Sequence, residues 1–510
     1  MSSPALAACL CASLIANLAF AQVPDGGGPE AQPSLTGKLT PTPVVSAPTG
    51  SPAEKLTWLA KQIDAALADP ALSKAKLGVA VTDVATGHTL YSRNDGALYN
   101  PASNAKLFTT SAALALLGPE YRWKTIVYAD RGISGGAVTR LYLKGHGDPT
   151  LVVEDLWRLV SQLYEMGLRR VSGDLVVDDT FFDDVRVGPG FDQKPEDLAF
   201  RAPQGALSLD YNAVGVRVLP GAADGAPARV VIDPETSYFT IINEARTVAT
   251  GRTLLTVETS EAPGHTVVTV KGRVRMHDAG RLLYRRVVHP DLFTASTFRA
   301  IAERHGIKFL GQVVRGATPP GARALAAHYS QSLGVAVRDV NKQSNNFMAE
   351  MVLKTLGAET GGAPGTWKKG LDAVAAFLDK VGIPHASYKM INGSGLYDSD
   401  RFSPDQIVKL LATVYKDFRF AADFVGSLSL AGADGTVSHR MEGSLAERMI
   451  RAKTGTLEGV SCLSGYAGAP GHAPLAFAIL MNGLRDSATG AARHAQDQIA
   501  EALVAYLLAR

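Results

Sequence analysis

The sequence predicts an α+β protein in which the two ends of the chain build one antiparallel five-stranded sheet flanked by the terminal helices, with a β-rich stretch between the two ends. Three observations predict this class. Two alternating apolar segments follow a helical pattern near the N-terminus, and three more precede a helical pattern at the C-terminus. Between the two ends, over residues 123–288, short β-type segments alternate with turn residues.

The N-terminal part of the sheet is predicted as an amphipathic helix, a hairpin and a second, apolar helix. The hairpin consists of two alternating segments around Ala85-Thr86-Gly87, and Gly118-Pro119 ends the apolar helix. The expected ranges are Ala53–Leu67 for the first helix, Leu77–Val84 and His88–Ser92 for the hairpin, and Leu107–Leu117 for the apolar run of the second helix.

The middle of the chain is predicted to be mostly strands. A G-x-S-x-G pattern, Gly132–Gly136, resembles a hydrolase nucleophile turn, but that motif requires a strand followed by a helix. Here β-type segments, Trp123–Ala129 and Ala137–Lys144, stand on both sides, so we expect a hairpin turn. Further strands are expected at Leu175–Val177, Val214–Leu219, Arg229–Ile232, Thr253–Glu258 and Thr266–Val270.

The C-terminal part resumes with a helix and supplies the other three strands of the sheet. A final amphipathic helix covers Ala491–Arg510. The expected ranges are Leu292–His305 for the first helix and Met449–Ala452, Ser461–Gly468 and Leu475–Met481 for the strands.

The first 52 residues differ in composition from the rest of the chain. Residues 1–24 carry no charged side chain, and Ala19-Phe20-Ala21 is a small-x-small cleavage pattern, so residues 1–21 are predicted to be a signal peptide. Residues 22–52 are rich in Pro, Gly, Ser and Thr and are predicted to be a linker. We expect export to the periplasm or secretion, with no transmembrane anchor after processing. Lipid attachment at Cys9 is the less favoured alternative.

Composition excludes several other classes of protein. The 51 basic and 48 acidic residues give a net charge of +3, without the basic excess of nucleic-acid-binding proteins. The histidines and cysteines show no metal-ligand spacing, so no metal and no cofactor are expected. After cleavage only Cys462 would remain, and its place within a strand predicts a small core residue rather than a catalytic thiol.

Three short motifs carry the chemistry. Ser103-Asn104-Ala105-Lys106 opens the apolar helix, so its serine and lysine lie one helical turn apart on one face. Ser344-Asn345-Asn346 and Lys453-Thr454-Gly455 follow in that order. A second S-x-x-K, Ser73–Lys76, lies between a helix and a strand, where nothing holds its lysine against its hydroxyl, so we interpret it as surface.

In this order the motifs are the signature of serine β-lactamases and penicillin-binding proteins. The spacing favours the second group, because Ser344 comes 241 positions after Ser103 and Lys453 comes 109 positions after Ser344, whereas class A β-lactamases keep the first two motifs much closer. The chain resembles the low-molecular-mass penicillin-binding proteins of the D-alanyl-D-alanine carboxypeptidase/endopeptidase family. Further segments carry this resemblance: Gly147–Leu151, Asp178–Asp183, Asn341–Glu350, Gly393–Leu396, Gly432–Thr436 and Lys453–Leu457. Asn392 departs from the aspartate usual before Gly-Ser-Gly-Leu, and Tyr397-Asp398 departs from the Ser-Arg pair usual after it.

The resemblance implies a serine β-lactamase/DD-peptidase-like fold, with helices on both sides of the five-stranded sheet. It implies a catalytic domain in two parts, residues 53–122 and 289–510, and two inserted β-rich domains in residues 123–288, one nested in the other. It also implies a serine-type D-Ala-D-Ala carboxypeptidase, with endopeptidase cleavage of cross-links, whose partners are peptidoglycan peptides and β-lactams. Two alternatives stay open: a β-lactamase, and a non-catalytic protein that binds peptidoglycan or senses β-lactams.

The motifs also suggest a role for each residue. Ser103 is expected to be the nucleophile, Lys106 its base with a pKa lowered by burial and by Lys453, and Ser344 a proton relay hydrogen-bonded to both lysines. Backbone N–H groups of Ser103 and Thr456 are expected to form the oxyanion hole. The expected substrate-binding residues are Asn346, Lys453, Thr454, Gly455 and Thr456, with Asp192 and Asp197 as candidates for gripping a cationic diamino-acid side chain.

Overall fold

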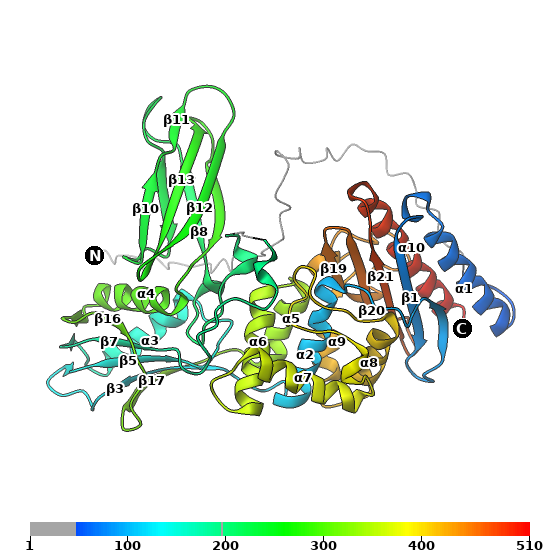
Figure 1. Cartoon of the computed structure of the whole chain (residues 1–510), viewed down its shortest axis with the longest axis horizontal. Helices are drawn as coiled ribbons and strands as arrows, with labels where there is room; N and C mark the ends of the chain where they lie inside the picture. The colour runs from blue at the N-terminus through cyan, green and yellow to red at the C-terminus, as the bar shows by residue number, and fades with distance from the viewer. Residues whose placement is uncertain (1–46, 195–196) are drawn as a thin grey trace, which may run out of the picture. The chain divides into compact units, whose positions relative to one another are not determined.

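One large antiparallel sheet, built from both ends of the chain, forms the centre of the computed structural model, which describes residues 47–194 and 197–510. Its strand order is β18-β19-β20-β21-β1-β2 (Figure 1). The strands are β18 (Ser429–Leu430), β19 (Ile450–Leu457), β20 (Val460–Ala467), β21 (Leu475–Asn482), β1 (Lys76–Asp83) and β2 (Thr89–Arg93). The five predicted strands are confirmed, and the two-residue strand β18 extends the sheet by one. The predicted signal peptide, Cys9 and most of the predicted linker lie outside the described residues.

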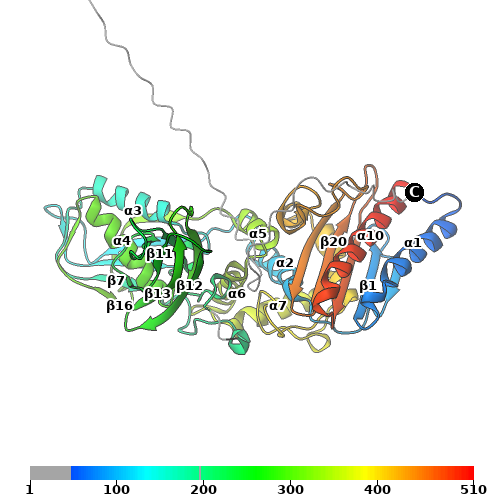
Figure 2. The ribbon, with the colours of Figure 1, turned by 90° about the horizontal axis from the view of Figure 1, so that it is seen from above.

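The sheet is apolar on both faces, because alternate residues of its strands enter two different cores. In β21, Phe477 and Ile479 pack in the core beneath α1 (Pro52–Leu67) and α10 (Thr489–Leu508), whereas Ala478 packs in the core on the other side. Figure 2 shows α1 and α10 on one side of the sheet and α2 and α7 on the other. Strands that are buried on both faces have continuous apolar sequences, as β21 has.

The helices on the second face surround the serine motifs singled out in the sequence. Ser103 lies in a short 3₁₀ turn that leads into α2, and Ser344 lies between α5 and α6. These helices share one core with α7, α8 and α9. Their bounds are α2 (Ala105–Leu117), α5 (Leu333–Lys342), α6 (Asn346–Gly361), α7 (Trp367–Val381), α8 (Pro404–Lys416) and α9 (Ala421–Ser427).

A second core lies under a five-stranded sheet of order β16-β7-β5-β3-β17. Strands β3 and β5 pair antiparallel, and Gly132–Gly136 lies in the connection between them, which confirms a turn there instead of a nucleophile motif. The segment expected as one strand, Ala137–Lys144, is two strands: β4 (Ala137–Val138) pairs with β6 (Arg170–Val171) in another sheet, and β5 pairs with β3. Helices α3 (Val153–Glu165) and α4 (Pro290–Arg304) add Leu159 and Phe298 to this core. The strands are β3 (Lys124–Ala129), β5 (Leu141–Gly145), β7 (Leu175–Asp178), β16 (Val313–Arg315) and β17 (Arg323–Tyr329).

Three smaller sheets complete the middle of the chain, as its β-rich pattern predicted. Parallel β4, β6 and β15 form one, β14-β8-β9 a second, and β10, β11 and β12 around β13 a third. Their bounds are β4 (Ala137–Val138), β6 (Arg170–Val171), β15 (Lys308–Phe309), β8 (Ala213–Leu219), β9 (Arg229–Asp233), β14 (Arg281–Arg286), β10 (Phe239–Asn243), β11 (Arg246–Val248), β12 (Leu254–Ala262) and β13 (His265–Arg275).

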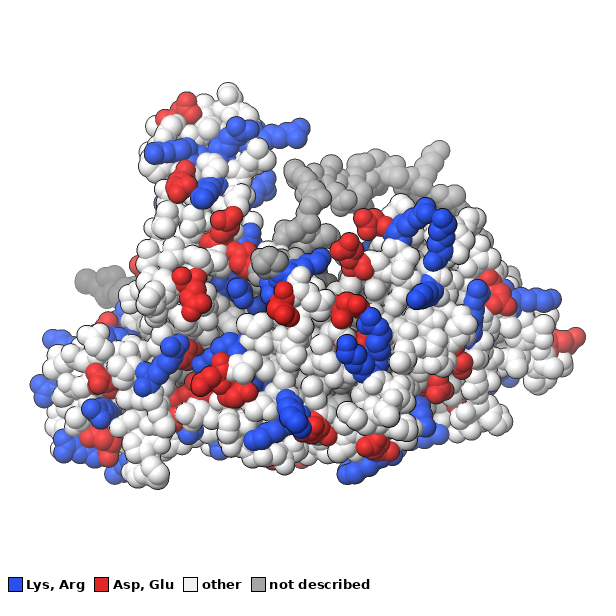
Figure 3. Space-filling model, in the orientation of Figure 1, with Lys and Arg blue, Asp and Glu red and all other residues white. Residues whose placement is uncertain are grey.

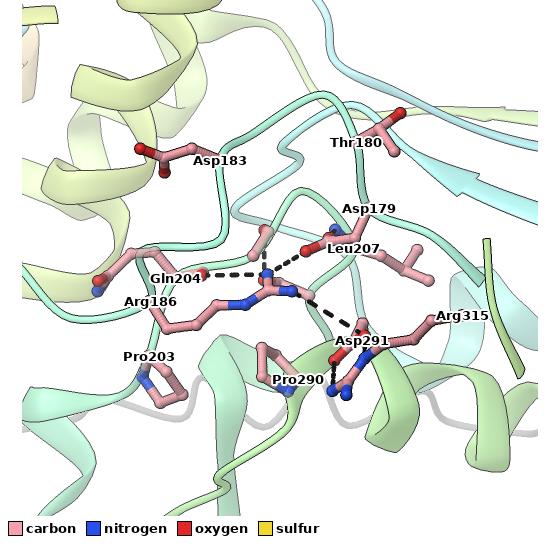
Figure 4. Close-up of polar contacts among 12 residues, drawn as sticks. Asp179, Thr180, Asp183, Arg186, Pro203, Gln204, Leu207, Pro290, Asp291 and Arg315 are labelled. Atoms are coloured by element: carbon pink, nitrogen blue, oxygen red, sulfur yellow. Dashed lines mark hydrogen bonds and ion pairs between the residues drawn. The ribbon is translucent and has the colours of Figure 1, made fainter. Parts of the chain in front are cut away.

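Ion pairs bind the segment that follows β7 to elements of both cores. Arg186 contacts Asp179 and, at 4.0 Å, Asp291, whose carboxylate is bound at 2.5 Å by Arg315 (Figure 4). Beyond Asp179, the same segment supplies Asp183, which pairs with Lys354 of α6 at 2.7 Å. Burial of Asp179 and the nearby Asp291 raise the pKa of Asp179 to about 6. The segment therefore connects the helical layer around the serine motifs to the β-rich middle of the chain.

The surface carries both signs of charge. On the face drawn in Figure 3, basic and acidic side chains are interspersed rather than gathered into a stripe. None of the helices in the described part of the chain combines the length and the apolar character needed to span a membrane.

Candidate active site

Ser103 is held in a strained turn at the start of α2. The residue before it, Ala102, has φ 46°, in the left-handed region that few non-glycine residues adopt, and its N–H donates to Asn100 Oδ1 at 2.9 Å. Strain of this type costs about 1–3 kcal/mol and persists where surrounding contacts fix it. Ser103 keeps 8% of its surface exposed, so its hydroxyl stands at the edge of a buried site.

Lys106 lies beneath Ser103 and is fully buried. Its Nζ is 3.0 Å from Ser103 Oγ, 2.7 Å from Asn346 Oδ1 and 2.8 Å from the carbonyl oxygen of Ser394. Burial lowers the pKa of Lys106 to about 7, against the opposing effect of Glu350 and Asp400. A lysine with such a pKa is largely neutral just above pH 7 and can accept a proton there.

Ser344 and Lys453 form a second hydroxyl–ammonium pair on the other side of the site. Lys453 Nζ donates to Ser344 Oγ at 2.8 Å and to the carbonyl oxygen of Thr454 at 2.9 Å. Burial, and then repulsion by Lys106, lower the pKa of Lys453 well below its usual range. We expected Ser344 to contact both lysines, but among the described hydrogen bonds it meets Lys453 alone, because the three contacts of Lys106 are made to other oxygens.

Asn346 contacts Lys106 from the start of α6. It is the first residue of that helix, two positions after Ser344, which itself has φ 56°. Its Oδ1 accepts a hydrogen bond from Lys106. Its amide Nδ2, which can only donate, makes no hydrogen bond within the described residues, so it is able to donate to a ligand.

The third motif lies along the edge of β19. Because β18 pairs only with Arg451 and Ala452, Lys453–Leu457 has no neighbouring strand on that side within the described residues. An extended peptide can add to such an edge. Gly455 lets the strand approach the Ser103 turn, since a Cβ there would lie 2.6 Å from the carbonyl oxygen of Pro101.

Two threonines stand at this open edge. Thr454 and Thr456 point to the same face of β19, and both are partly exposed. Thr454 Oγ1 donates to Thr436 Oγ1 at 2.8 Å. The three sequence motifs thus converge on one site of two serines, two buried lysines and an open strand edge.

This arrangement matches an established family. The sequence agrees with the D-Ala-D-Ala carboxypeptidase 3 (S13) family over residues 59–503. The chain belongs to this family. It is accordingly a serine-type peptidase, a D-Ala-D-Ala carboxypeptidase.

Curated relatives and solved structures agree with this membership. The chain is 37% identical over 502 residues to a D-alanyl-D-alanine carboxypeptidase of Actinomadura sp. (strain R39), covering 94% of this chain and 91% of the relative. It is 25% identical over 395 residues to the D-alanyl-D-alanine carboxypeptidase DacB of Haemophilus influenzae, covering 75% and 80%. The fold is similar to that of penicillin binding protein 4 from H. influenzae, with TM-score 0.74 and 22% identity, covering 85% and 97%.

The two aspartates proposed to grip a cationic substrate group lie in different surroundings. Asp192 is exposed in a short 3₁₀ turn. Phe191, in the same turn, packs against Leu396 and Tyr397, at the end of the loop that contains Ser394. Asp197 instead accepts from the Thr259 amide at 2.6 Å and lies 3.6 Å from Arg285.

These contacts bear differently on the two roles. Asp192 remains open to solvent beside the site, whereas the carboxylate of Asp197 is engaged within the β-rich middle of the chain. The roles of both stay predictions, and the contacts of Asp197 count against it.

Sequence reasoning missed a buried carboxylate in this S13 peptidase. Glu350 of α6 is fully buried and accepts four hydrogen bonds: two at 3.0 Å from the Gly393 N–H, one at 2.8 Å from the Ser394 N–H and one at 2.8 Å from Trp367 Nε1. It thereby holds the loop whose Ser394 carbonyl meets Lys106. The only signal in the sequence was its place in the segment Asn341–Glu350.

A second buried carboxyl, Asp400, lies near the first. One oxygen accepts from the Ile391 N–H at 2.8 Å, and Oδ2 has no hydrogen-bond partner within the described residues. Burial and the proximity of Glu350 raise the pKa of Asp400 to about 7. Burial lowers the pKa of Lys106, and the nearby carboxylates of Glu350 and Asp400 raise it. These two carboxylates therefore limit how far the pKa of that lysine falls.

Proposed function

We propose that this protein hydrolyses the terminal D-alanyl-D-alanine bond of peptidoglycan stem peptides through an acyl-enzyme on Ser103, and that it also cleaves D-alanyl cross-links. Membership of the S13 family supports the carboxypeptidase activity. The roles of individual residues and the cleavage of cross-links are our inference.

The observation that carries the proposal is the set of three oxygens around Lys106. The Asn346 Oδ1 and the Ser394 carbonyl can only accept hydrogen bonds. A neutral lysine amine has two N–H groups and one lone pair, so these two acceptors would use both N–H groups. The lone pair is then left for Ser103 Oγ, 3.0 Å away, whose O–H would donate to it. This is the geometry of a general base poised on a nucleophile.

The reaction follows from this starting state. Lys106 takes the proton as Ser103 Oγ bonds to the carbonyl carbon, and N–H groups of Ser103 and Thr456 stabilise the oxyanion, each by about 3–4 kcal/mol in comparable hydrolases. The C–N bond then breaks as the departing amine takes the hydroxyl proton of Ser344, and the proton held by Lys106 replaces it, which leaves Lys106 neutral again. Lys453, with the hydroxyls of Thr454 and Thr456, holds the carboxylate of the leaving group. Water finally attacks the ester: Lys106 takes a proton from the water and gives it to Ser103 Oγ as the ester bond breaks, which releases the acid and free Ser103.

Cleavage of cross-links would use the same steps with a larger leaving group. The edge of β19 from Lys453 to Leu457, which pairs with no described strand on that side, supports this extension, because a second peptide chain could extend along it. We further propose that the predicted signal peptide exports the protein, which would place it where peptidoglycan and β-lactams occur.

Two other functions make different predictions. A β-lactamase would release the penicilloyl group within seconds, and a non-catalytic binding protein would release no D-alanine. Neither has a specific observation in its favour, since no further base apart from Lys106 contacts Ser103 within the described residues.

The test is intact-protein mass spectrometry with benzylpenicillin, followed over hours, for the wild type and for Ser103→Ala. We expect a stable one-to-one adduct in the wild type and none in Ser103→Ala. Ser73→Ala is the matched control: Ser73 belongs to the second S-x-x-K, but its hydroxyl donates to the Pro70 carbonyl at 2.7 Å, so this variant should keep the adduct. Labelling of Ser103→Ala would refute the assignment, and an adduct lost within seconds would favour a β-lactamase.

A further inference from the structure

We propose that a hollow beside the Ser344 and Lys453 motifs binds the carboxylates of an acidic peptide attached to the leaving amine, and so selects cross-linked substrates. This inference rests on the proposed endopeptidase activity and names the part of the site that serves it. The hollow has a volume of about 390 Å³ and lies between α5, α9 and the paired strands β18 and β19.

One helix supplies a continuous wall. Gly334, Arg338 and Lys342 are four residues apart along α5, so they line one face of the helix over two turns. The opposite wall comes from α9, where the carboxylate of Asp423 lies against Gly334: a Cβ on that glycine would be 2.6 Å from Asp423 Oδ1. Arg451, paired with Leu430 across β18 and β19, closes the third side.

The charges of the hollow leave two cations able to bind a ligand. Lys342 and Asp434 form a hydrogen-bonded ion pair at 2.5 Å, and this contact helps to hold the pKa of Asp434 below its usual range. The guanidinium groups of Arg338 and Arg451 make no hydrogen bond or close ion pair within the described residues, although Asp339 interacts with Arg338, and Asp434 with Arg451, through their charges at longer range. With Lys342 and the two arginines against Asp423 and Asp434, the lining of the hollow carries one net positive charge. Guanidinium groups bind carboxylates through paired hydrogen bonds, which suits an acidic peptide.

The position of the hollow assigns it to the leaving-group side. Arg451 lies nearer the start of β19 than the residues of the active site. Going back along the strand, the proposed oxyanion donor Thr456 comes first, then the carboxylate anchors Thr454 and Lys453, and then Arg451. Arg451 is two residues before Lys453 and therefore on the same face, about 7 Å further along the strand. Lys342 is likewise two residues before Ser344.

This order separates the two substrates. A free D-alanine leaving group ends at its carboxylate, next to Lys453, and cannot reach Arg451. The amine released from a cross-link belongs to a second peptide, whose chain continues past the carboxylate anchor into the hollow. The two arginines should therefore stabilise the cross-linked substrate and leave the carboxypeptidase substrate unaffected.

The experiment compares Arg338→Gln, Arg451→Gln and the double variant on two substrates, a monomeric pentapeptide and a D-alanyl cross-linked muropeptide dimer. We expect the double variant to raise KM for the dimer by about tenfold or more, because charge-assisted hydrogen bonds are lost. D-alanine release from the monomer and acylation by benzylpenicillin should stay within twofold of wild type. Arg419→Gln is the control, since Arg419 pairs with Asp417 outside the hollow.

Salt provides an independent readout. Raising the ionic strength should raise the KM of the wild type for the dimer, and the double variant should lose most of this dependence.

The outcomes distinguish the two proposals. If the wild type cleaves the dimer and the double variant cleaves it equally well, the anion-binding hollow is refuted and the endopeptidase proposal stands. An equal loss on dimer and monomer would also refute it, because the arginines would then act on the whole site. If the wild type releases D-alanine but leaves the dimer intact, the endopeptidase proposal fails, and the hollow fails with it as a determinant of cross-link cleavage.

Discussion

At the scale of single residues, the protonation state of Lys106 should control the rate of acylation. The pKa of this lysine is lowered to about 7, and only its neutral form can accept the Ser103 proton. Below pH 7 the ammonium form dominates, so the acylation rate by benzylpenicillin should fall tenfold for each further pH unit, whereas it should level off above about pH 8. Stopped-flow measurement of the acylation rate over a pH series gives this acidic limb of the pH–rate profile. A limb centred above pH 9 would show that Lys106 is not the base.

Glu350 should affect the pH at which the acylation rate falls, without contacting the substrate. Glu350→Gln keeps the shape of the side chain but turns one oxygen into an N–H donor, which would face a backbone or Trp367 donor at a cost of about 1–3 kcal/mol. It also removes a negative charge that raises the pKa of Lys106. We expect slower acylation at the plateau and a limb displaced to lower pH.

The control for this variant lies on the same helix. Glu359→Gln loses only an exposed contact with the Tyr121 hydroxyl, so neither the plateau nor the limb should change. A purely structural role for Glu350 would lower the rate and leave the limb where it is, so an unmoved limb in Glu350→Gln would contradict the positioning role.

The catalytic residues could be predicted from sequence, but their supporting residues could not. Ser103 and Lys106 carry their signal in local spacing, because three residues of helix bring them together. Glu350 and Asp400 meet the site through the tertiary path of the loop after α7, which no local pattern encodes. The Lys106–Ser344 hydrogen bond was predicted wrongly for a related reason. The spacing of the motifs indicates which side chains lie near Lys106, but not to which of the nearby oxygens its N–H groups donate.

At the scale of elements, the loop Gly393–Leu396 packs directly on the nucleophile turn. Gly395 has φ +72°, and a Cβ there would lie 2.0 Å from the carbonyl oxygen of Ala102. Gly395→Ala must therefore displace the backbone next to Ser103. Displacements of about 1 Å cost reacting groups about 100-fold in rate, so we expect a loss of this order in the acylation rate constant for benzylpenicillin.

Gly483 separates this clash from the cost of the backbone conformation. It has the same φ of +72°, but a Cβ there would meet no atom within 4 Å, so Gly483→Ala carries the strain of a left-handed alanine without the collision. We expect Gly483→Ala to lose about 1 kcal/mol of stability and to acylate at the wild-type rate. Equal acylation rates in the two variants would show that the contact with Ala102 does not position Ser103.

The elements themselves were largely predictable. Four strands of the central sheet have apolar patterns bounded by clear turns, and their predicted ranges agree with the structure within one residue at each end. The fifth, predicted as Met449–Ala452, continues as β19 to Leu457, because the polar motif that interrupts the apolar pattern is itself part of the strand. The edge strand β18 was missed because two residues carry no periodicity, and it forms only because Leu430 and Ser429 pair with β19. It nonetheless decides where the open edge of β19 begins.

At the scale of the whole molecule, the sequence predicted an insertion over residues 123–288 with the catalytic domain resuming at residue 289. That division remains a prediction. Strand pairing and core contacts associate α4, β16 and β17 with β3 and β7, so they favour a return to the catalytic part nearer Ser330. A helical pattern shows that a segment is a helix, but not which of two cores it packs against, and this is why the position of the return could not be predicted.

The contact between Lys354 and Asp183 should couple the two cores energetically. Lys354 is fully buried, its ammonium group is 4.3 Å from the centre of the Trp367 ring, and its partner Asp183 is 23% exposed. Lys354→Met keeps the length of the side chain but leaves Asp183 and the Val185 carbonyl without their donor. Because the aspartate can recover some hydration, we expect a loss of about 2–3 kcal/mol in the free energy of unfolding by urea, near the lower limit for breaking buried pairs. Lys368→Met, which breaks the exposed pair with Asp372 on α7, should cost less than about 0.5 kcal/mol, and equal losses in the two variants would contradict a coupling role for Lys354.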